Sequence, residues 1–62
     1  MTEPEIQAAA AAIANARGMR RGAPHVENIL DVLRASNLGK VYLEVVEDAK
    51  AALTAAEAVR KT

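Results

Sequence analysis

The chain has 62 residues, no cysteine, one histidine, and eight acidic against eight basic side chains, so its formal net charge is zero. This length limits it to one domain, residues 1–62, with a small core. The missing cysteines exclude a disulfide framework and fit a cytoplasmic location. The neutral balance gives no general attraction to nucleic acid or to an anionic membrane, and no stretch approaches the roughly 18 consecutive apolar residues of a membrane-spanning helix.

Thirteen of the fifteen alanines gather in two blocks near the ends of the chain, and alanine is the best helix former. The first block belongs to a helix expected at about residues 3–17. Thr2 and Glu5 have the spacing of a capping box, and Pro4 is tolerated in the first turn. Gly18 is a natural end for this helix, although a short extension beyond it stays open.

A connector with two glycines and a proline follows, over residues 18–24. Pro24 is expected to occupy the first turn of a second helix, at about residues 24–36. The apolar residues of this segment recur at i, i+3, i+4 and i+7, the template of an amphipathic helix. They are Val26, Ile29, Leu30 and Leu33. This stripe is the densest hydrophobic face that the sequence predicts.

A third helix is expected at about residues 39–60, with a turn before it. Asn37 and Gly39 are residues that tolerate a left-handed cap at the end of the second helix, while Ser36 or Asn37 could instead cap the start of the third. No segment shows the alternation of a strand together with a second strand to pair with. The fold class is therefore predicted to be all-α, a small three-helix domain.

Two apolar stripes are read first as core seams of the domain, and part of them is also a candidate self-association seam. The third helix carries apolar residues in strict 3-4-3-4 spacing, which suits a helix bundle, and the first helix carries two isoleucines a heptad apart. The seam consists of Ile6, Ile13, Tyr42, Val45, Ala49, Ala52, Ala56 and Val59. Because bulky apolar residues are few and no disulfide or metal can stabilise so short a chain, we expect homo-oligomerisation.

Catalysis, cofactor binding and metal binding are not expected. His25 is the single histidine and Ser36 the single serine, and the sequence offers no group that pairs them. A structural zinc site needs about four ligands and a catalytic one about three, which one histidine without cysteine does not supply. We predict that the protein is not an enzyme, and we read His25 as a partly exposed residue in the first turn of the second helix.

A basic cluster is the sharpest local feature of the sequence. Arg17, Arg20, Arg21 and His25 lie within nine residues around two glycines. Arginine binds carboxylates and phosphates bidentately, so the cluster is a candidate partner-binding site for protein or, as a weaker alternative, for nucleic acid. Positive charge at a helix C-terminus is also favourable by itself. The chain lacks Phe and Trp, which disfavours a surface on which nucleic-acid bases could stack.

Two segments resemble parts of small uncharacterised α-helical proteins of tailed phages and prophages. One is Ala11-Ala12-Ile13-Ala14-Asn15-Ala16-Arg17-Gly18, and the other is Glu47-Asp48-Ala49-Lys50-Ala51-Ala52-Leu53. The resemblance implies a phage or mobile-element origin and no activity. The function expected from the sequence is non-enzymatic protein–protein interaction, by an accessory or inhibitor protein that binds itself and a larger, unidentified protein. The alternative is a nucleic-acid-associated regulator that uses the three arginines.

Overall fold

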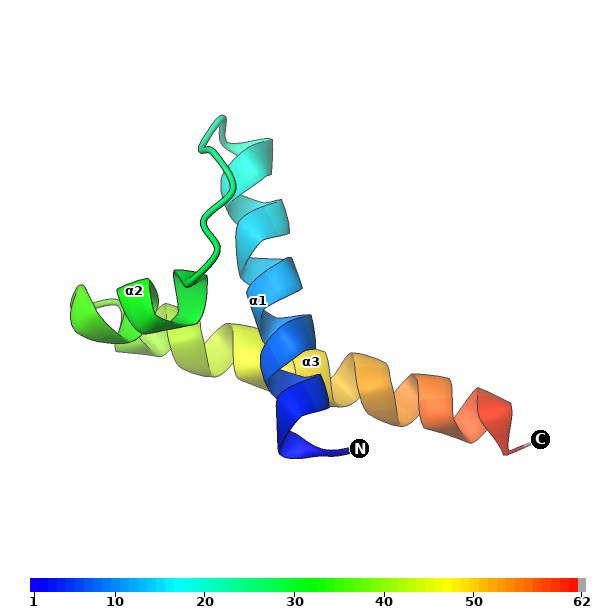
Figure 1. The fold of residues 1–62 in the computed structure, drawn as a ribbon. Coiled ribbons are helices and arrows are strands. Elements are labelled where there is room, and N and C mark those ends of the chain that lie inside the picture. The colour runs from blue at the N-terminus through cyan, green and yellow to red at the C-terminus, as the bar shows by residue number, and fades with distance from the viewer. Residues whose placement is uncertain (62) are drawn as a thin grey trace.

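The computed structural model describes residues 1–61, which form three helices and no strand: α1 (Glu3–Arg20), α2 (Ile29–Ala35) and α3 (Gly39–Arg60). This confirms the all-α, three-helix architecture that the sequence predicts. Figure 1 shows α1 standing across α3, with the short α2 beside the beginning of α3. Within residues 1–61, none of the helices has the combination of length and hydropathy needed to span a bilayer.

The start of α1 is the capping box that Thr2 and Glu5 predict. Thr2 Oγ1 accepts a hydrogen bond from the Glu5 N–H at 3.4 Å, and Glu5 Oε1 accepts one from the Thr2 N–H at 2.8 Å. Hydrogen bonding with the Thr2 side chain, and then with its backbone, lowers the pKa of the Glu5 carboxyl. The helix passes through Gly18 and ends at Arg20, because the left-handed residue is Gly22, with a φ of 89°.

The second helix is shorter than the sequence predicts. It begins at Ile29 and not at Pro24, so the expected first turn is wrong, and His25 lies exposed in the connector. The reason is a tertiary hydrogen bond. The backbone N–H and C=O of Val26 both bond to the side chain of Asn15 on α1, and this pairing holds the connector in a non-helical conformation.

The turn between α2 and α3 uses one of the two expected arrangements. Asn37 takes the left-handed conformation, with a φ of 63°. The Ser36 hydroxyl donates to the Val32 carbonyl and so closes α2. Leu38 is the N-cap of α3 and makes no side-chain capping bond, so the alternative in which Ser36 or Asn37 caps α3 is wrong.

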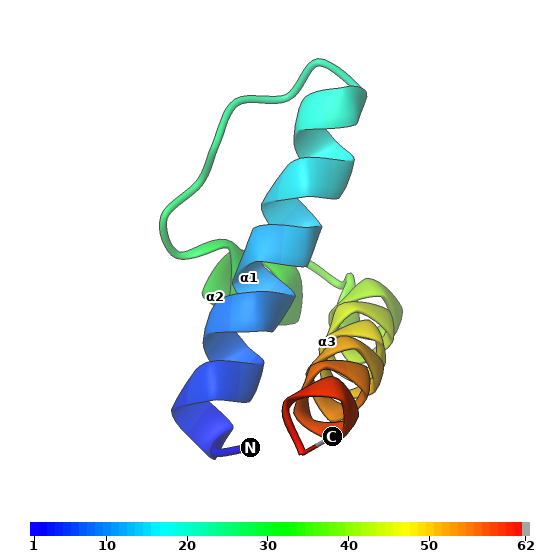
Figure 2. The same cartoon turned by 90° about the vertical axis from the view of Figure 1, so that its right-hand side faces the viewer.

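The core lies where the three helices meet, and most of its residues follow i, i+4 rows. The buried apolar residues are Ile6, Ala10, Ala14, Leu30, Leu33, Val45 and Ala49. Interlocking i±4 ridges give helix pairs that cross at about 50°, whereas 3-4 spacing gives nearly parallel bundles. Figures 1 and 2 show α1 crossing α3 steeply.

The row on α3 continues towards its C-terminus along the side that faces the beginning of α1. Leu53 packs against the core, and Glu57 Oε1 lies 2.5 Å from the N-terminal ammonium of Met1. This hydrogen bond, and then the charge of the ammonium, lower the pKa of the Glu57 carboxyl. The contact ties the beginning of α1 to the last third of α3.

Candidate functional site

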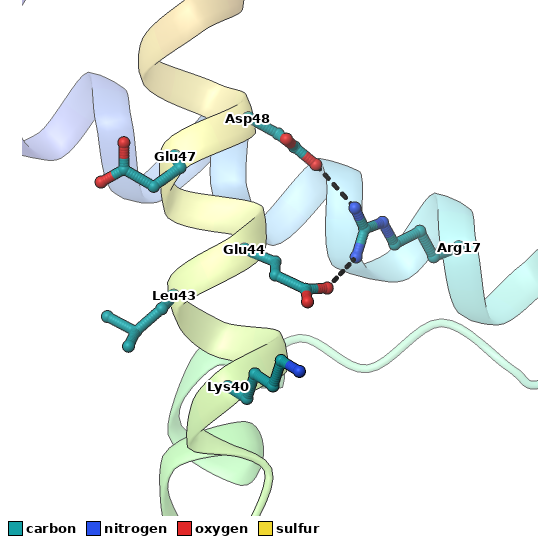
Figure 3. Close-up of a pocket in the computed structure, with 6 residues that line it drawn as sticks. All are labelled: Arg17, Lys40, Leu43, Glu44, Glu47 and Asp48. Carbon is teal, nitrogen blue, oxygen red and sulfur yellow. Dashed lines mark hydrogen bonds and ion pairs between the residues drawn. The ribbon is translucent and has the colours of Figure 1, made fainter.

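Arg17 of the predicted basic cluster forms ion pairs within the chain. Its Nη2 lies 2.6 Å from Asp48 Oδ2 and its Nη1 3.5 Å from Glu44 Oε1, so one guanidinium on α1 bridges two carboxylates one turn apart on α3. Figure 3 shows the Arg17 side chain reaching across to α3 between these two acids. Each such partly exposed pair contributes about 0.2–1 kcal/mol, and the two pairs add a weak electrostatic link between α1 and α3.

The other three members of the basic cluster face solvent. Arg20 lies in the last turn of α1, Arg21 is its C-cap, and His25 lies in the connector. Among residues 1–61, neither Arg20 nor Arg21 forms an ion pair. The four residues that sequence groups together are therefore divided between an internal clamp and an exposed basic corner.

An open depression lies beside this clamp on the surface of α3. It has a volume of about 400 Å³ and is lined by Arg17, Lys40, Leu43, Glu44, Glu47 and Asp48. In Figure 3, Leu43 and Glu47 point to the side of α3 away from Arg17. Five of its six lining residues are charged, and Leu43 is 63% exposed. The depression is an open, solvent-exposed surface that carries one exposed leucine.

A more enclosed hollow lies where α1, the start of α2 and the start of α3 converge, and we call it the junction groove. Its volume is about 250 Å³. Apolar side chains form its floor: Ala14, Ile29, Leu33, Leu38 and Val41. Gly18 also lines it, and its charged lining residues are Arg17, Arg21 and Glu44. The groove therefore combines an apolar floor with one residue of the exposed basic corner, Arg21.

Asn15 is a buried hydrogen-bonding residue whose role the sequence analysis did not predict. It is 8% exposed, and it is the single polar residue in the buried set of residues 1–61. Its Oδ1 accepts from the Val26 N–H and its Nδ2 donates to the Val26 C=O, both at 2.9 Å. The sequence signal that could have indicated this role is the position of one amide side chain between Ala14 and Ala16, within an alanine-rich helix. The role of Asn15 is to anchor the connector between α1 and α2, on which His25 lies.

The predicted self-association seam is divided between the core and the surface. Ile6, Val45 and Ala49 are buried within the single chain, and Ile13 and Tyr42 are partly buried. The remaining seam residues, Ala52, Ala56 and Val59, are exposed. The part of the seam that another molecule can reach is thus the C-terminal half of α3.

Residues 1–61 contain no group of three or more His, Asp or Glu side chains placed to hold a metal ion. The acidic pair Glu44 and Asp48, which shares one helix face, is occupied by Arg17. The Ser36 hydroxyl is bonded to the Val32 carbonyl, and His25 is in a different segment of the chain. Polar groups of this part of the chain form helix caps, ion pairs between helices and hydrogen bonds to the connector.

Comparison with known proteins adds no relative: no protein-family model, no curated protein and no solved structure matches this chain. Functional argument therefore starts from the two surfaces described above, the exposed half of the seam on α3 and the junction groove.

Proposed function

We propose that this chain is a non-enzymatic helical protein–protein interaction module that first associates with a second copy of itself. The observation that carries the proposal is the uncovered face on the C-terminal half of α3. Ala52, Ala55 and Ala56 are exposed and, with Val59, they fall at i, i+3, i+4 and i+7. That is the spacing with which a helix buries one face against a neighbour.

The small side chains of this face suit a helix as the occupant. Alanine adds little bulk beyond the backbone, so two such faces can approach closely over several turns. The C-terminal half of α3 has little tertiary packing, and a helical segment of that length is marginally stable in water by itself. Covering the face would therefore stabilise the end of α3. We call Ala52, Ala55, Ala56 and Val59 the alanine face.

Charge along α3 favours a second copy in the antiparallel direction. Asp48 precedes the alanine face and Arg60 follows it, each at an edge of the face. In an antiparallel pair centred near residue 54, Asp48 of each copy lies level with Arg60 of the other, and the helix dipoles are opposed favourably. The same patch is then used by both copies, as two-fold symmetry requires.

Sedimentation velocity over a concentration series tests the proposal. We expect the wild-type chain to shift from monomer to dimer, and Ala56→Glu to stay monomeric because a carboxylate would be buried in the interface. Thr54→Glu is the matched control, since Thr54 is exposed on the opposite side of α3 and either glutamate gains a basic residue four positions away, Arg60 or Lys50. A wild-type chain that remains monomeric up to millimolar concentration would refute self-association.

The remaining parts of the proposal concern the larger partner and the origin. The resemblance of two segments to small phage proteins supports an accessory or inhibitor role in a phage or mobile element, with the partner in the cytoplasm of its host. The alternative, a nucleic-acid regulator, has less support because Arg17 is bound to Glu44 and Asp48. A gel shift at low salt that disappears in an Arg20→Ala, Arg21→Ala double variant would favour that alternative.

A further inference from the structure

The junction groove has the size and accessibility of a pocket for a side chain. Its volume of about 250 Å³ is below the roughly 300–1,000 Å³ of pockets that hold cofactors and drug-sized ligands. The floor is reachable from solvent, because Leu38 is 45% exposed and Val41 is only partly buried. Small, apolar, accessible pockets of this kind receive the anchor residues of protein interfaces.

The charge at the groove selects the chemistry of the occupant. Of its three charged lining residues, Arg17 and Glu44 pair with each other, which leaves Arg21 uncompensated. The guanidinium of Arg21 is exposed, and among residues 1–61 it has no acidic partner. Arginine binds a carboxylate through two parallel hydrogen bonds, and it is enriched among the residues that dominate interface energies.

We propose that the junction groove binds a segment of a partner protein that places one bulky apolar side chain next to a carboxylate. The apolar side chain enters the groove between Leu33, Leu38 and Val41, and the carboxylate pairs with Arg21. This inference rests on the proposed interaction role, but it uses a different surface from the alanine face. It identifies the chemistry of the larger partner at the point of contact.

The test is a titration of the isotope-labelled chain, followed by amide chemical shifts, with three blocked peptides. The probe GSEELFEEGS carries an apolar centre with acidic flanks, GSKKLFKKGS reverses the flanking charge, and GSEESSEEGS lacks the apolar centre. We expect the first peptide to shift the amides of Gly18, Leu38 and Val41, and the other two to bind at least about tenfold more weakly, since burying an apolar side chain and pairing a charge are each worth about 1.4 kcal/mol or more.

Two matched pairs of variants assign the contacts. Arg21→Glu is expected to weaken binding of the first peptide at least about tenfold, whereas Arg20→Glu, on an exposed neighbour that does not line the groove, is expected to change it less than about threefold. Leu38→Asp is expected to abolish the shifts, whereas Leu43→Asp, on an exposed leucine outside the groove, leaves them in place. Retained helical circular dichroism in each variant shows that the fold is intact.

Several outcomes would overturn the proposal. They are the absence of shifts at millimolar peptide, equal binding of the lysine-flanked peptide, equal losses for Arg20→Glu and Arg21→Glu, and groove shifts that appear on concentrating the chain alone, which would make a second copy the occupant. The same titration on Ala56→Glu separates this inference from self-association, because Ala56 lies outside the groove. Peptide binding by that variant supports the groove even if the wild-type chain never dimerises.

Discussion

Asn15 determines where the second helix begins. A buried amide that lacked partners would cost about 1–3 kcal/mol, and Asn15 meets this demand by bonding both backbone groups of Val26. Those groups are then unavailable to a helix, so the apolar pattern that starts at Val26 becomes helical only at Ile29. The Asn15 side chain on α1 thus determines how many residues the connector has, and it keeps His25 in the connector and outside α2.

Asn15→Ala is therefore expected to destabilise the fold by about 1–3 kcal/mol, because it leaves the Val26 N–H and C=O without their partner in a partly buried site. Urea denaturation followed by circular dichroism measures this loss. Gln7→Ala is the control, since Gln7 on the same helix also donates an amide hydrogen bond, to Glu3, but that bond is exposed to solvent. Equal midpoints for Asn15→Ala and Gln7→Ala would contradict the anchor role of Asn15.

This bond also marks the limit of what the sequence could predict. The capping box of Thr2 and Glu5 acts over three residues, so local spacing was sufficient to find it. Asn15 and Val26 are eleven residues apart and meet only after α1 has folded against the connector. Arg17 and its acids, Glu44 and Asp48, are separated by still more of the chain, so their pairing was likewise invisible to a reading of local pattern.

At the scale of the helices, the arrangement of α1 and α3 depends on which row of side chains on each helix is buried. The sequence places Ala49 on an apolar stripe that suits either a core or a self-association seam, and in the structure Ala49 is buried within the single chain. The sequence does not fix the row that is used, because alanine marks several rows of α3 equally well. Leu53 and Glu57 continue the row that α1 covers, and this leaves Ala52 and Ala56 outside it.

Ala10→Leu is expected to destabilise the fold by about 1–3 kcal/mol, because Ala10 is fully buried where α1 crosses α3 and a longer side chain would force the helices apart. Urea denaturation again provides the measurement. Ala12→Leu makes the same change at an exposed position of α1 and should stay within about 0.5 kcal/mol of wild type. If both variants were equally stable, close approach at Ala10 would not be what orients the helices.

The whole molecule is elongated, with extents of 39 × 21 × 17 Å, because α3 extends past the point where α1 crosses it. Three of the seven buried apolar residues among residues 1–61 are alanines, Ala10, Ala14 and Ala49, so the core is small. The junction groove is a hollow that the side chains of the three converging helices leave open. The alanine face is the part of α3 that neither α1 nor α2 covers. Both proposed contacts thus follow from one feature, a core too small to cover its longest helix.

The far end of this elongated structure is held by the contact between the Met1 ammonium and Glu57, and its strength should depend on pH. Because the ammonium lowers the pKa of the folded-state Glu57 carboxyl below its ordinary value of 4.5, the unfolded chain binds this proton more tightly. The stabilisation is then fully present above the ordinary value and is lost as pH falls through the folded-state pKa.

Glu57→Gln should therefore lower the melting temperature near neutral pH and approach the wild-type value in acid, as thermal denaturation over a pH series would reveal. Glu47→Gln removes a carboxylate of α3 that does not contact the N-terminus, so its difference from wild type should lack this dependence on Met1. Acetylation of Met1 should reproduce the effect of Glu57→Gln in the wild-type chain and add nothing in the variant. If acetylation destabilised both chains equally, the ammonium and Glu57 would not be energetically coupled, and the beginning of α1 would be held to α3 by apolar packing alone.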